Sequence, residues 1–371
     1  MLHRLARLHK PDYLFAVVLL LLVVFGLVLL SSASAPTAIA RFDDAYFFVK
    51  RQVLFGVLPG LALFLVIASV DYRLLKRYYF IFFLLSLLLL ILVFIPGLRA
   101  SFGTARSWIE VGNFSMQPSE VVKLLFIIFL AAWFDASAPE KITDIKKGIM
   151  PFVMFVGIIL ALLMLQPDMG TFALFGVVSF CMAFLAGARL THLAVLGGVG
   201  IAGLGALIVS APYRVARFMT FLHPELDPQG VGYHINQALL AIGSGGFWGL
   251  GFGHSRQKFQ YLPEVISDSI FAVYAEEFGF ISAVLLILAF IWIMRRGFKI
   301  ASLAPDRFGS LLVYGIMVWF GFQAFFNIAA MVGLMPLTGL PLPFVSHGGT
   351  ALMTALAGAG LVVSVSRQTR K

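Results

Sequence analysis

The sequence predicts an all-α polytopic membrane protein with about ten transmembrane helices. Of its 371 residues, 61% are hydrophobic and 12% are charged, a balance that excludes a water-soluble globular fold. The apolar residues form about ten runs, each near the length that a helix needs to cross about 30 Å of hydrocarbon. Helices are expected because no water inside a bilayer can satisfy backbone amides.

The expected spans cover residues 14–31, 53–70, 78–96, 121–134, 149–165, 172–187, 190–210, 278–294, 311–334 and 349–366. The first run resembles a secretory signal, but its apolar core is longer than that of a signal, so we expect a retained helix. The whole chain, 1–371, is expected to form a single membrane domain. Its long extracytoplasmic loop would cover about 211–270, between helices 7 and 8.

Most of the 27 Lys and Arg residues lie in the connections on one side of these spans, including both chain ends. Because Lys and Arg favour cytoplasmic loops, both termini are expected in the cytoplasm. The cations are spread over short connections, which argues against a nucleic-acid partner. Cys181 is the only cysteine, so a disulfide framework or thiolate metal site is not expected.

The long loop alternates polar and apolar residues and is not expected to be a disordered tail. Residues 236–243 place apolar side chains at helical spacing, which predicts a short helix along the membrane surface. The glycines of 249–253 follow no strand and precede no Lys-Ser/Thr pair, so they do not indicate a nucleotide-binding loop.

Three positions place carboxylates where the chain enters the membrane. Glu120 and Lys123 share one face of the fourth span, as a functional pair or as a structural ion pair. Asp168 follows the fifth span and has a functional or a helix-capping interpretation. Asp268 lies where the long loop re-enters a helix. Partial desolvation there would raise its pKa and suit a general base, and the alternative is again a helix cap.

An uncharged segment, 333–350, is rich in Gly and Pro at membrane depth. Irregular backbone there is tolerated only where it is buried in protein or lines a cavity, so this segment, with Ser346 and His347, is expected to form a site wall. The histidines show no spacing typical of metal ligands.

Taken together, these segments resemble the SEDS family (shape, elongation, division and sporulation; FtsW, RodA and SpoVE), membrane glycosyltransferases that polymerise peptidoglycan. The resemblance covers nearly the whole chain, and residues 237–246 with 255–259 are more similar to the division branch, FtsW, than to the elongation branch, RodA. It rests on the stretches 106–108, 117–123, 166–171, 233–246, 262–268, 276–277 and 339–349.

The chain departs from the family pattern beside these motifs. His347 stands where the family usually has Tyr, Ile266-Ser267 replaces His-Thr, and Ser269 replaces Phe. The aromatic hydroxyl and the imidazole of the family pattern are therefore absent from these positions. The aspartate, Asp268, is retained.

The resemblance implies transfer of a disaccharide from one polyprenyl-pyrophosphate-linked glycan, lipid II, to the 4-hydroxyl of another at the outer face of the cytoplasmic (inner) membrane. Asp268 would be the catalytic base. Cations that could bind pyrophosphate are Arg106, Lys123, Arg214, Arg217, Arg256 and Lys258. Residues expected to support the site are Glu120, Asp168, Glu264, Glu277, Ser346 and His347.

The resemblance also implies a divalent cation such as Mg²⁺ or Mn²⁺, which the sequence neither requires nor excludes. The implied partners are a class B penicillin-binding protein transpeptidase and other membrane proteins of the divisome. Alternatives are an elongation (RodA-like) polymerase, a lipid II flippase and a non-catalytic scaffold. The polymerase is favoured over the flippase because charges crowd the outer interface and no internal repeat is visible.

Overall fold

The structure is a computed structural model that describes residues 10–97, 107–111, 114–137, 139–210 and 212–369. In these ranges the chain is mostly helical, with one two-stranded antiparallel hairpin in which Ile109 pairs with Met116 and with irregular segments at 245–269 and 332–348. All ten expected spans coincide with helices, as the hydrophobic runs predict.

In chain order, the helices and strands fall into three groups. The N-terminal elements are α1 (Tyr13–Phe42), α2 (Phe47–Gln52), η1 (Val53–Val57), α3 (Leu58–Ser69), α4 (Arg73–Lys76), α5 (Tyr79–Leu92), β1 (Ile109–Val111) and β2 (Phe114–Met116). The central elements are α6 (Pro118–Ala136), α7 (Pro139–Ile142), η2 (Ile145–Ile149), α8 (Met150–Leu165), α9 (Met169–Leu185) and α10 (Leu190–Val209). The remaining elements are α11 (Pro212–Leu222), η3 (Pro224–Leu226), α12 (Val231–Ser244), α13 (Ile270–Ser302), α14 (Arg307–Met331) and α15 (Gly349–Ser366).

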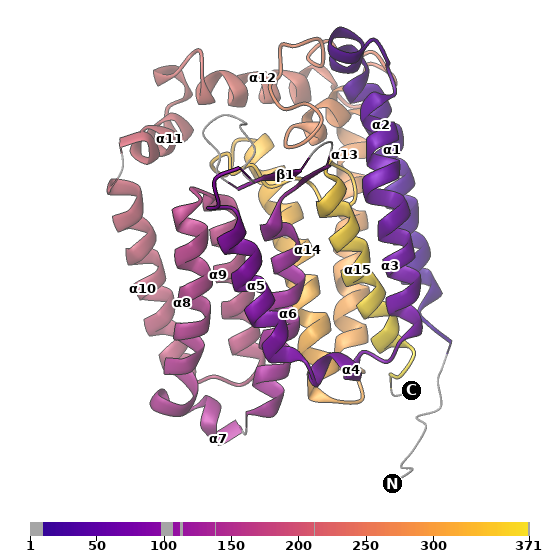
Figure 1. Cartoon of the computed structure of the whole chain (residues 1–371). Helices are drawn as coiled ribbons and strands as arrows, with labels where there is room; N and C mark the ends of the chain where they lie inside the picture. Colours follow the sequence, from indigo (N-terminus) through magenta and orange to yellow (C-terminus); the bar gives the residue numbers. More distant parts are fainter. Residues whose placement is uncertain (1–9, 98–106, 112–113, 138, 211, 370–371) are drawn as a thin grey trace.

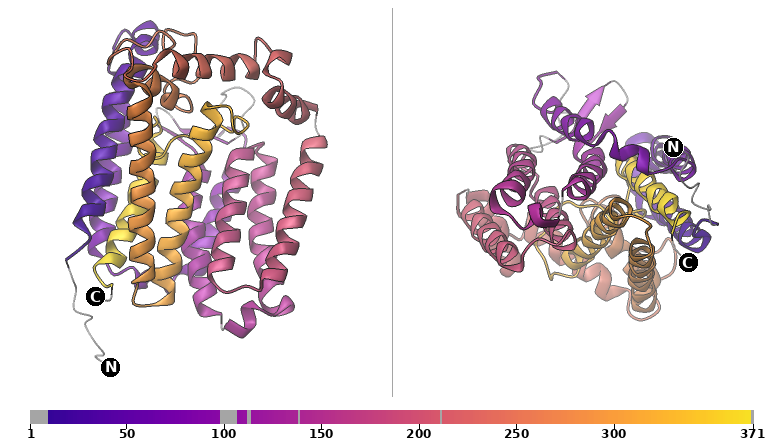
Figure 2. Two further views of the ribbon diagram at one scale, coloured as in Figure 1. Left: turned by 180° about the vertical axis from the view of Figure 1, so that it is seen from behind. Right: turned by 90° about the horizontal axis from the view of Figure 1, so that it is seen from below.

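The long helices run roughly parallel and form a bundle (Figure 1). Seven helical stretches of the described chain are long and apolar enough to cross a membrane, and α5 and α9 are shorter apolar helices. The start of α1 and the end of α15 lie at the same end of the bundle as α4 and α7, while α11 and α12 lie across the opposite end (Figures 1 and 2). The chain is therefore a multi-pass membrane protein.

The interior of the bundle is centred on α14 and α15. Helix α14 packs against α6, α9 and α13, and α15 packs along α3. Large apolar side chains such as Trp319 and Phe320 of α14 and Phe129 of α6 are fully buried. By contrast, α10 buries one side chain among its described residues, Leu193, and stands at the edge of the bundle (Figure 2).

The long loop contains the surface helix that the sequence predicts. Helix α12 is longer than expected and buries Ile235, Ala238 and Ala241 on one face. These residues recur at helical spacing, so the helix presents one apolar face to the bundle, while Leu239 and Leu240 are exposed on its other side.

Helix α13 starts earlier than the sequence predicts, at Ile270, and is interrupted at Gly279, whose φ of 78° is left-handed. The glycine-rich segment before it satisfies the broken hydrogen bonds, because Leu250 N–H donates to the Glu276 carbonyl and Phe280 N–H donates to the Gly246 carbonyl. A Cβ at position 279 would come within 2.3 Å of the Gly249 nitrogen. Glycine is therefore required at this break.

Candidate active site

A large cavity lies beneath α11 and α12 at the end of the bundle opposite the chain ends. Its volume is about 1250 Å³, above the range usual for small-ligand pockets. The walls come from α2 and η1, the β1–β2 hairpin, the start of α6, the turn between α8 and α9, α11, α12, and the segments 264–268 and 337–351. The Gly- and Pro-rich segment forms part of this wall, as its composition predicts.

Asp268 is half-buried in this cavity, just before α13. Ser269 holds the N-cap position of α13, and no side chain caps that helix end by a hydrogen bond. Among the described residues, no hydrogen bond to the Asp268 carboxylate is formed. The helix-capping interpretation of Asp268 therefore does not apply, and the carboxylate is free to meet a ligand.

Burial raises the pKa of Asp268 to about 7, with further contributions from the negative charges of Glu264 and Asp168. Desolvation and like charges both disfavour the ionised form of a carboxylate. A group with a pKa near the working pH is substantially deprotonated and is still a strong enough base to accept a proton from a substrate. Asp268 has the properties of a general base at neutral pH.

Three consecutive backbone carbonyls, those of residues 266, 267 and 268, are held by groups from the C-terminal part of the chain. His347 N–H donates to the Ile266 carbonyl at 2.8 Å. The Ser346 hydroxyl donates to the Ser267 carbonyl at 2.5 Å, and Asn327 Nδ2 donates to the Asp268 carbonyl at 2.8 Å. This carbonyl clamp fixes the backbone that carries Asp268 to α14 and to the wall before α15.

Further contacts position the residues on either side of Asp268. The Ser269 hydroxyl donates to the Pro263 carbonyl, so it accepts the 2.6 Å hydrogen bond from His234 Nε2. Gly339, with φ of 72°, passes close to the carboxylate, since a Cβ there would lie 3.6 Å from Asp268 Oδ2. The position of Asp268 is thus set by four separate segments of the chain.

Glu120 and Lys123 form a buried ion pair at 2.7 Å, as their spacing predicts. Glu120 lines the cavity, and Lys123 extends away from it to Gln323 Oε1 at 2.9 Å and lies over the Trp319 ring. Gln323 in turn donates to the Pro341 carbonyl. The pair therefore ties α6 to α14 and to the cavity wall.

Asp168 fits both of its interpretations. Its Oδ1 accepts from Thr171 N–H at 3.0 Å and caps α9, and its Oδ2 accepts from Gln117 Nε2 at 3.3 Å. It also lines the cavity, and burial raises the pKa of its carboxyl. Glu264 lines the same cavity.

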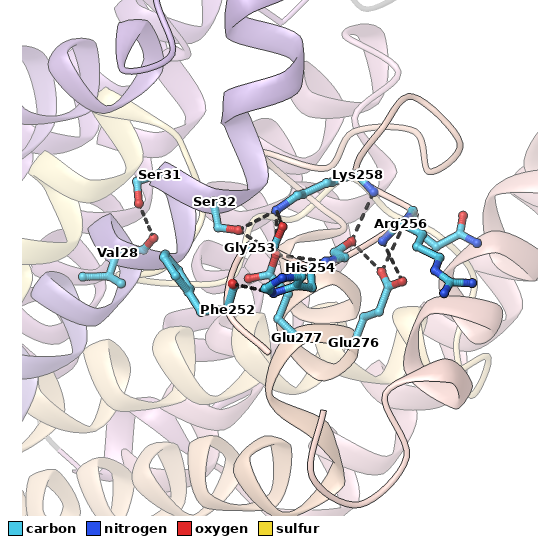
Figure 3. A network of polar contacts seen from close by, with 12 residues as sticks. Val28, Ser31, Ser32, Phe252, Gly253, His254, Arg256, Lys258, Glu276 and Glu277 are labelled. Carbon is cyan, nitrogen blue, oxygen red and sulfur yellow. Dashed lines mark hydrogen bonds and ion pairs between the residues drawn. The ribbon is translucent and has the colours of Figure 1, made fainter. Parts of the chain in front are cut away.

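Lys258 and Glu277 lie together at a distance from the cavity lining, in the network of Figure 3. Lys258 Nζ is 2.8 Å from Glu277 Oε1 and also donates to the Ser32 hydroxyl on α1 and to the Gly253 carbonyl. Both charged side chains are almost fully buried. Lys258 therefore ties the long loop to α1 and α13 where the sequence suggested a pyrophosphate ligand.

The other predicted cations are placed differently from one another. Arg214 turns back and donates to the Leu207 carbonyl at the end of α10, and it does not line the cavity. Arg256 is exposed, and its backbone N–H donates to Glu276. Arg106 and the side chain of Arg217 lie outside the part of the chain that the structure describes.

Several cavity residues were missed by the sequence reasoning, among them Arg51 and His234. Arg51 lines the cavity from α2, although the sequence marks it only as one of the cations on the outer side. His234 lines it from α12. Arg51 lies outside the family-like stretches, and His234 lies within the stretch 233–246 but was not singled out there. The contact of α2 with the segment before α15 and that of α12 with Ser269 bring the two side chains to the cavity.

The charge of the cavity is strongly negative among the residues described. Six carboxylates line it, and Arg51 is the one Lys or Arg side chain that does so within the described ranges: the carboxylates are those of Glu110, Glu120, Asp168, Asp227, Glu264 and Asp268. No three His, Cys, Asp or Glu side chains of the described chain are grouped closely enough to hold a metal ion. The described side chains therefore do not fit a preformed divalent-cation site.

A family model for the cell cycle proteins FtsW, RodA and SpoVE matches residues 12–371. The chain belongs to this family. Stage V sporulation protein E of Bacillus subtilis is 42% identical over 361 residues, covering 97% of this chain and 98% of that protein. The "Probable peptidoglycan glycosyltransferase FtsW" of Trichlorobacter lovleyi is 38% identical over 365 residues, covering 97% and 95%.

Solved structures agree with this membership. A chain in a structure of a peptidoglycan synthase complex superposes with a TM-score of 0.79 at 28% identity, covering 96% of this chain and 98% of that chain. The rod shape determining protein RodA of Thermus thermophilus gives a TM-score of 0.71 at 28% identity, covering 97% and 98%. The SEDS resemblance and the polytopic helical fold that the sequence predicts are both confirmed.

Proposed function

We propose that this chain is a peptidoglycan glycosyltransferase that polymerises lipid II, with Asp268 as its general base. One observation carries the proposal: a carboxylate without a hydrogen-bond partner among the described residues, with a pKa raised to about 7, lies in a large cavity and is held in place by the carbonyl clamp. A structural carboxylate would be expected to have a donor or a cation as partner.

The proposed reaction is a displacement at the anomeric carbon of the donor sugar. Asp268 accepts the proton of the acceptor's 4-hydroxyl while that oxygen forms a bond to the anomeric carbon. The bond from this carbon to the diphosphate oxygen breaks, and the electron pair leaves with the polyprenyl diphosphate. The protonated Asp268 then loses its proton to solvent through the cavity.

The leaving diphosphate needs positive charge near it, because charge builds up on its oxygens as the bond breaks. Arg51 lines the cavity and supplies a guanidinium group. Arg106 and Arg217, which the sequence analysis predicts as pyrophosphate ligands, are also proposed to bind the diphosphate. Lys123 acts through Glu120 and Gln323 in this proposal, since both of these hydrogen-bonding partners hold its ammonium group.

The setting of the reaction follows from the charge pattern of the chain. Lys and Arg residues concentrate at the end of the bundle with α4 and α7, so that end is proposed to face the cytoplasm. The cavity then opens toward the outer face of the cytoplasmic membrane. A class B penicillin-binding protein and divisome membrane proteins are the proposed partners, with septal cell-wall synthesis as the proposed role and cell elongation as the alternative.

Polymer formation in detergent tests the enzyme against the flippase alternative, because flipping has no meaning without a bilayer. The purified chain, alone and with its cognate transpeptidase, would be incubated with lipid II and the products separated by gel. Glycan polymer is expected. A stable, correctly assembled complex that forms no polymer but moves lipid II across vesicles would favour the flippase.

A further inference from the structure

His347 is a cavity residue whose imidazole has no use in the reaction described above. Its ring lines the cavity and packs edge-on against Phe48, with ring centroids 5.4 Å apart. Neither ring nitrogen has a hydrogen-bond partner among the described residues, and Nδ1 is fully enclosed. A ring in the wall of a cavity with a hydrogen-bond partner for neither nitrogen calls for an explanation.

The backbone around His347 is held firmly, which makes a loose or accidental placement of the ring a poor explanation. Gln52 brackets the residue: its Nε2 donates to the Ser346 carbonyl at 3.3 Å and its Oε1 accepts from Gly348 N–H at 2.9 Å. His347 N–H itself donates to the Ile266 carbonyl. The imidazole is thus presented to the cavity from a fixed support.

The state of the ring follows from its surroundings. Burial, with a smaller contribution from the positive charge of Arg51, lowers the pKa of His347 to about 4, so the ring is neutral near pH 7. A neutral imidazole carries one N–H and one bare nitrogen. Because a buried N–H without an acceptor is rarer than a bare acceptor, the proton is expected on Nε2 and the lone pair on the enclosed Nδ1.

We propose that His347 Nε2–H donates a hydrogen bond to a diphosphate oxygen of the polyprenyl-linked substrate, next to Arg51. The two side chains come from α2 and from the segment before α15, and they line one cavity. An N–H donor beside a guanidinium matches an anionic oxygen better than it matches a neutral hydroxyl. This inference rests on the proposed function, and it assigns a specificity role to a position where the chain departs from the family's usual Tyr.

A binding measurement tests this assignment without requiring turnover. The detergent-solubilised chain would be titrated with undecaprenyl diphosphate, which has the diphosphate and the polyprenyl chain but no sugar. His347→Phe keeps the ring but removes both nitrogens, and we expect it to weaken binding roughly 10-fold or more, as for loss of a hydrogen bond to a charged group. His347→Gln, whose amide N–H can replace Nε2–H, should bind within a few-fold of the parent.

His347→Asn is the matched control, because its shorter amide reaches the position of Nδ1 and not that of Nε2; it should bind as weakly as His347→Phe. Melting temperatures of all variants separate binding from folding, and the Gln and Asn variants carry the comparison if the Phe variant unfolds. The proposal would be overturned if His347→Phe bound undecaprenyl diphosphate as tightly as the parent. It would also be overturned if the variant raised KM for lipid II without losing affinity for undecaprenyl diphosphate, because the ring would then contact the saccharide. A parent chain that binds undecaprenyl diphosphate yet forms no polymer would contradict the proposed function and leave this inference standing.

Discussion

The side-chain amide of Asn327 donates to the backbone carbonyl of Asp268 and to that of Leu340, both at 2.8 Å. One amide group therefore joins the loop that carries the proposed base to the opposite cavity wall. Asn327 is almost fully buried in α14, a helix whose other neighbours hold it in place. This relationship makes Asn327 a positioning residue for Asp268.

Replacing Asn327 by Leu should lower kcat for lipid II polymerisation by roughly 10- to 100-fold with a smaller change in KM. The reason is that displacement of a catalytic group by about 1 Å can cost that much in rate, while the cavity keeps its shape. Polymerisation kinetics of the variant would be measured in detergent with its melting temperature.

Thr354→Val is the matched control for Asn327→Leu. Its hydroxyl is also buried and donates to the Thr350 carbonyl one turn back in the same helix, α15. It should keep kcat near the parent value. Equal losses in both variants would mean that any buried polar deletion disturbs the bundle, and Asn327 would then have no special relation to Asp268.

The polymerisation rate should depend on pH through Asp268. Only the ionised form accepts a proton, and with a pKa of about 7 the active fraction falls about tenfold for each pH unit below 7 and levels off above it. Glu264→Gln removes one of the charges that raise this pKa, so its profile should move to lower pH. A rate that stays flat from pH 5 to pH 8 would remove Asp268 as the titrating group.

The free energy of unfolding should also depend on pH through Asp268. It should fall as pH rises, whereas the polymerisation rate should increase. The Asp268 pKa is raised above the usual 3.8, so the folded chain holds this proton more tightly than the unfolded chain does. The stabilising contribution is fully present below about pH 4 and is lost as pH rises through about 7, at about 1.4 kcal/mol for each unit between the folded and unfolded pKa values.

Asp268→Asn cannot ionise, so it should become more stable than the parent as pH rises from 4 to 7, with a constant advantage above that. Thermal melting in detergent at several pH values measures the difference. Glu110→Gln, a change at an exposed carboxylate of the same cavity, serves as the control for the loss of one acidic group. A pH-independent difference between Asp268→Asn and the parent would contradict the raised pKa.

Variants of the buried Lys258–Glu277 pair should lose stability and not substrate binding, as expected for a structural ion pair and not for a pyrophosphate ligand. Lys258→Met leaves Glu277 uncompensated in a buried position and should destabilise the chain by about 3–5 kcal/mol. The double variant Lys258→Met, Glu277→Gln should recover most of that stability and retain polymerase activity. A stable but inactive double variant would return Lys258 to the role of substrate ligand.

Sequence patterns predict the membrane fold well because each span is a local property. A run of apolar residues determines a helix whatever its neighbours are. Helical spacing also predicts that Ile235 and Ala238 lie on the buried face of α12, although Leu239, which the same spacing places there, is exposed. Asp268 could also be identified from the sequence as a candidate base. Its position where a loop re-enters a helix indicates partial desolvation, and no knowledge of its neighbours in the fold is needed.

What the sequence does not reveal are the contacts between distant segments. Asn327 and Asp268 are 59 positions apart, and Ser346 and Ser267 are 79 apart, so no local pattern marks the carbonyl clamp. The charge of Lys258 likewise suggested a pyrophosphate ligand, because its contacts with Glu277 and Ser32 are not visible in the sequence. Arg51 lines the cavity because α2 contacts the segment before α15, which the sequence does not reveal.

The most direct test of the account is lipid II polymerisation by Asp268→Asn, measured beside its melting temperature and its binding to the partner transpeptidase. Asn keeps nearly the volume of Asp and leaves the backbone carbonyl available to Asn327. The account predicts a folded, partner-binding protein whose rate is lower by about 10²- to 10⁴-fold, as for loss of a general base. Polymerisation within a few-fold of the parent rate would contradict it.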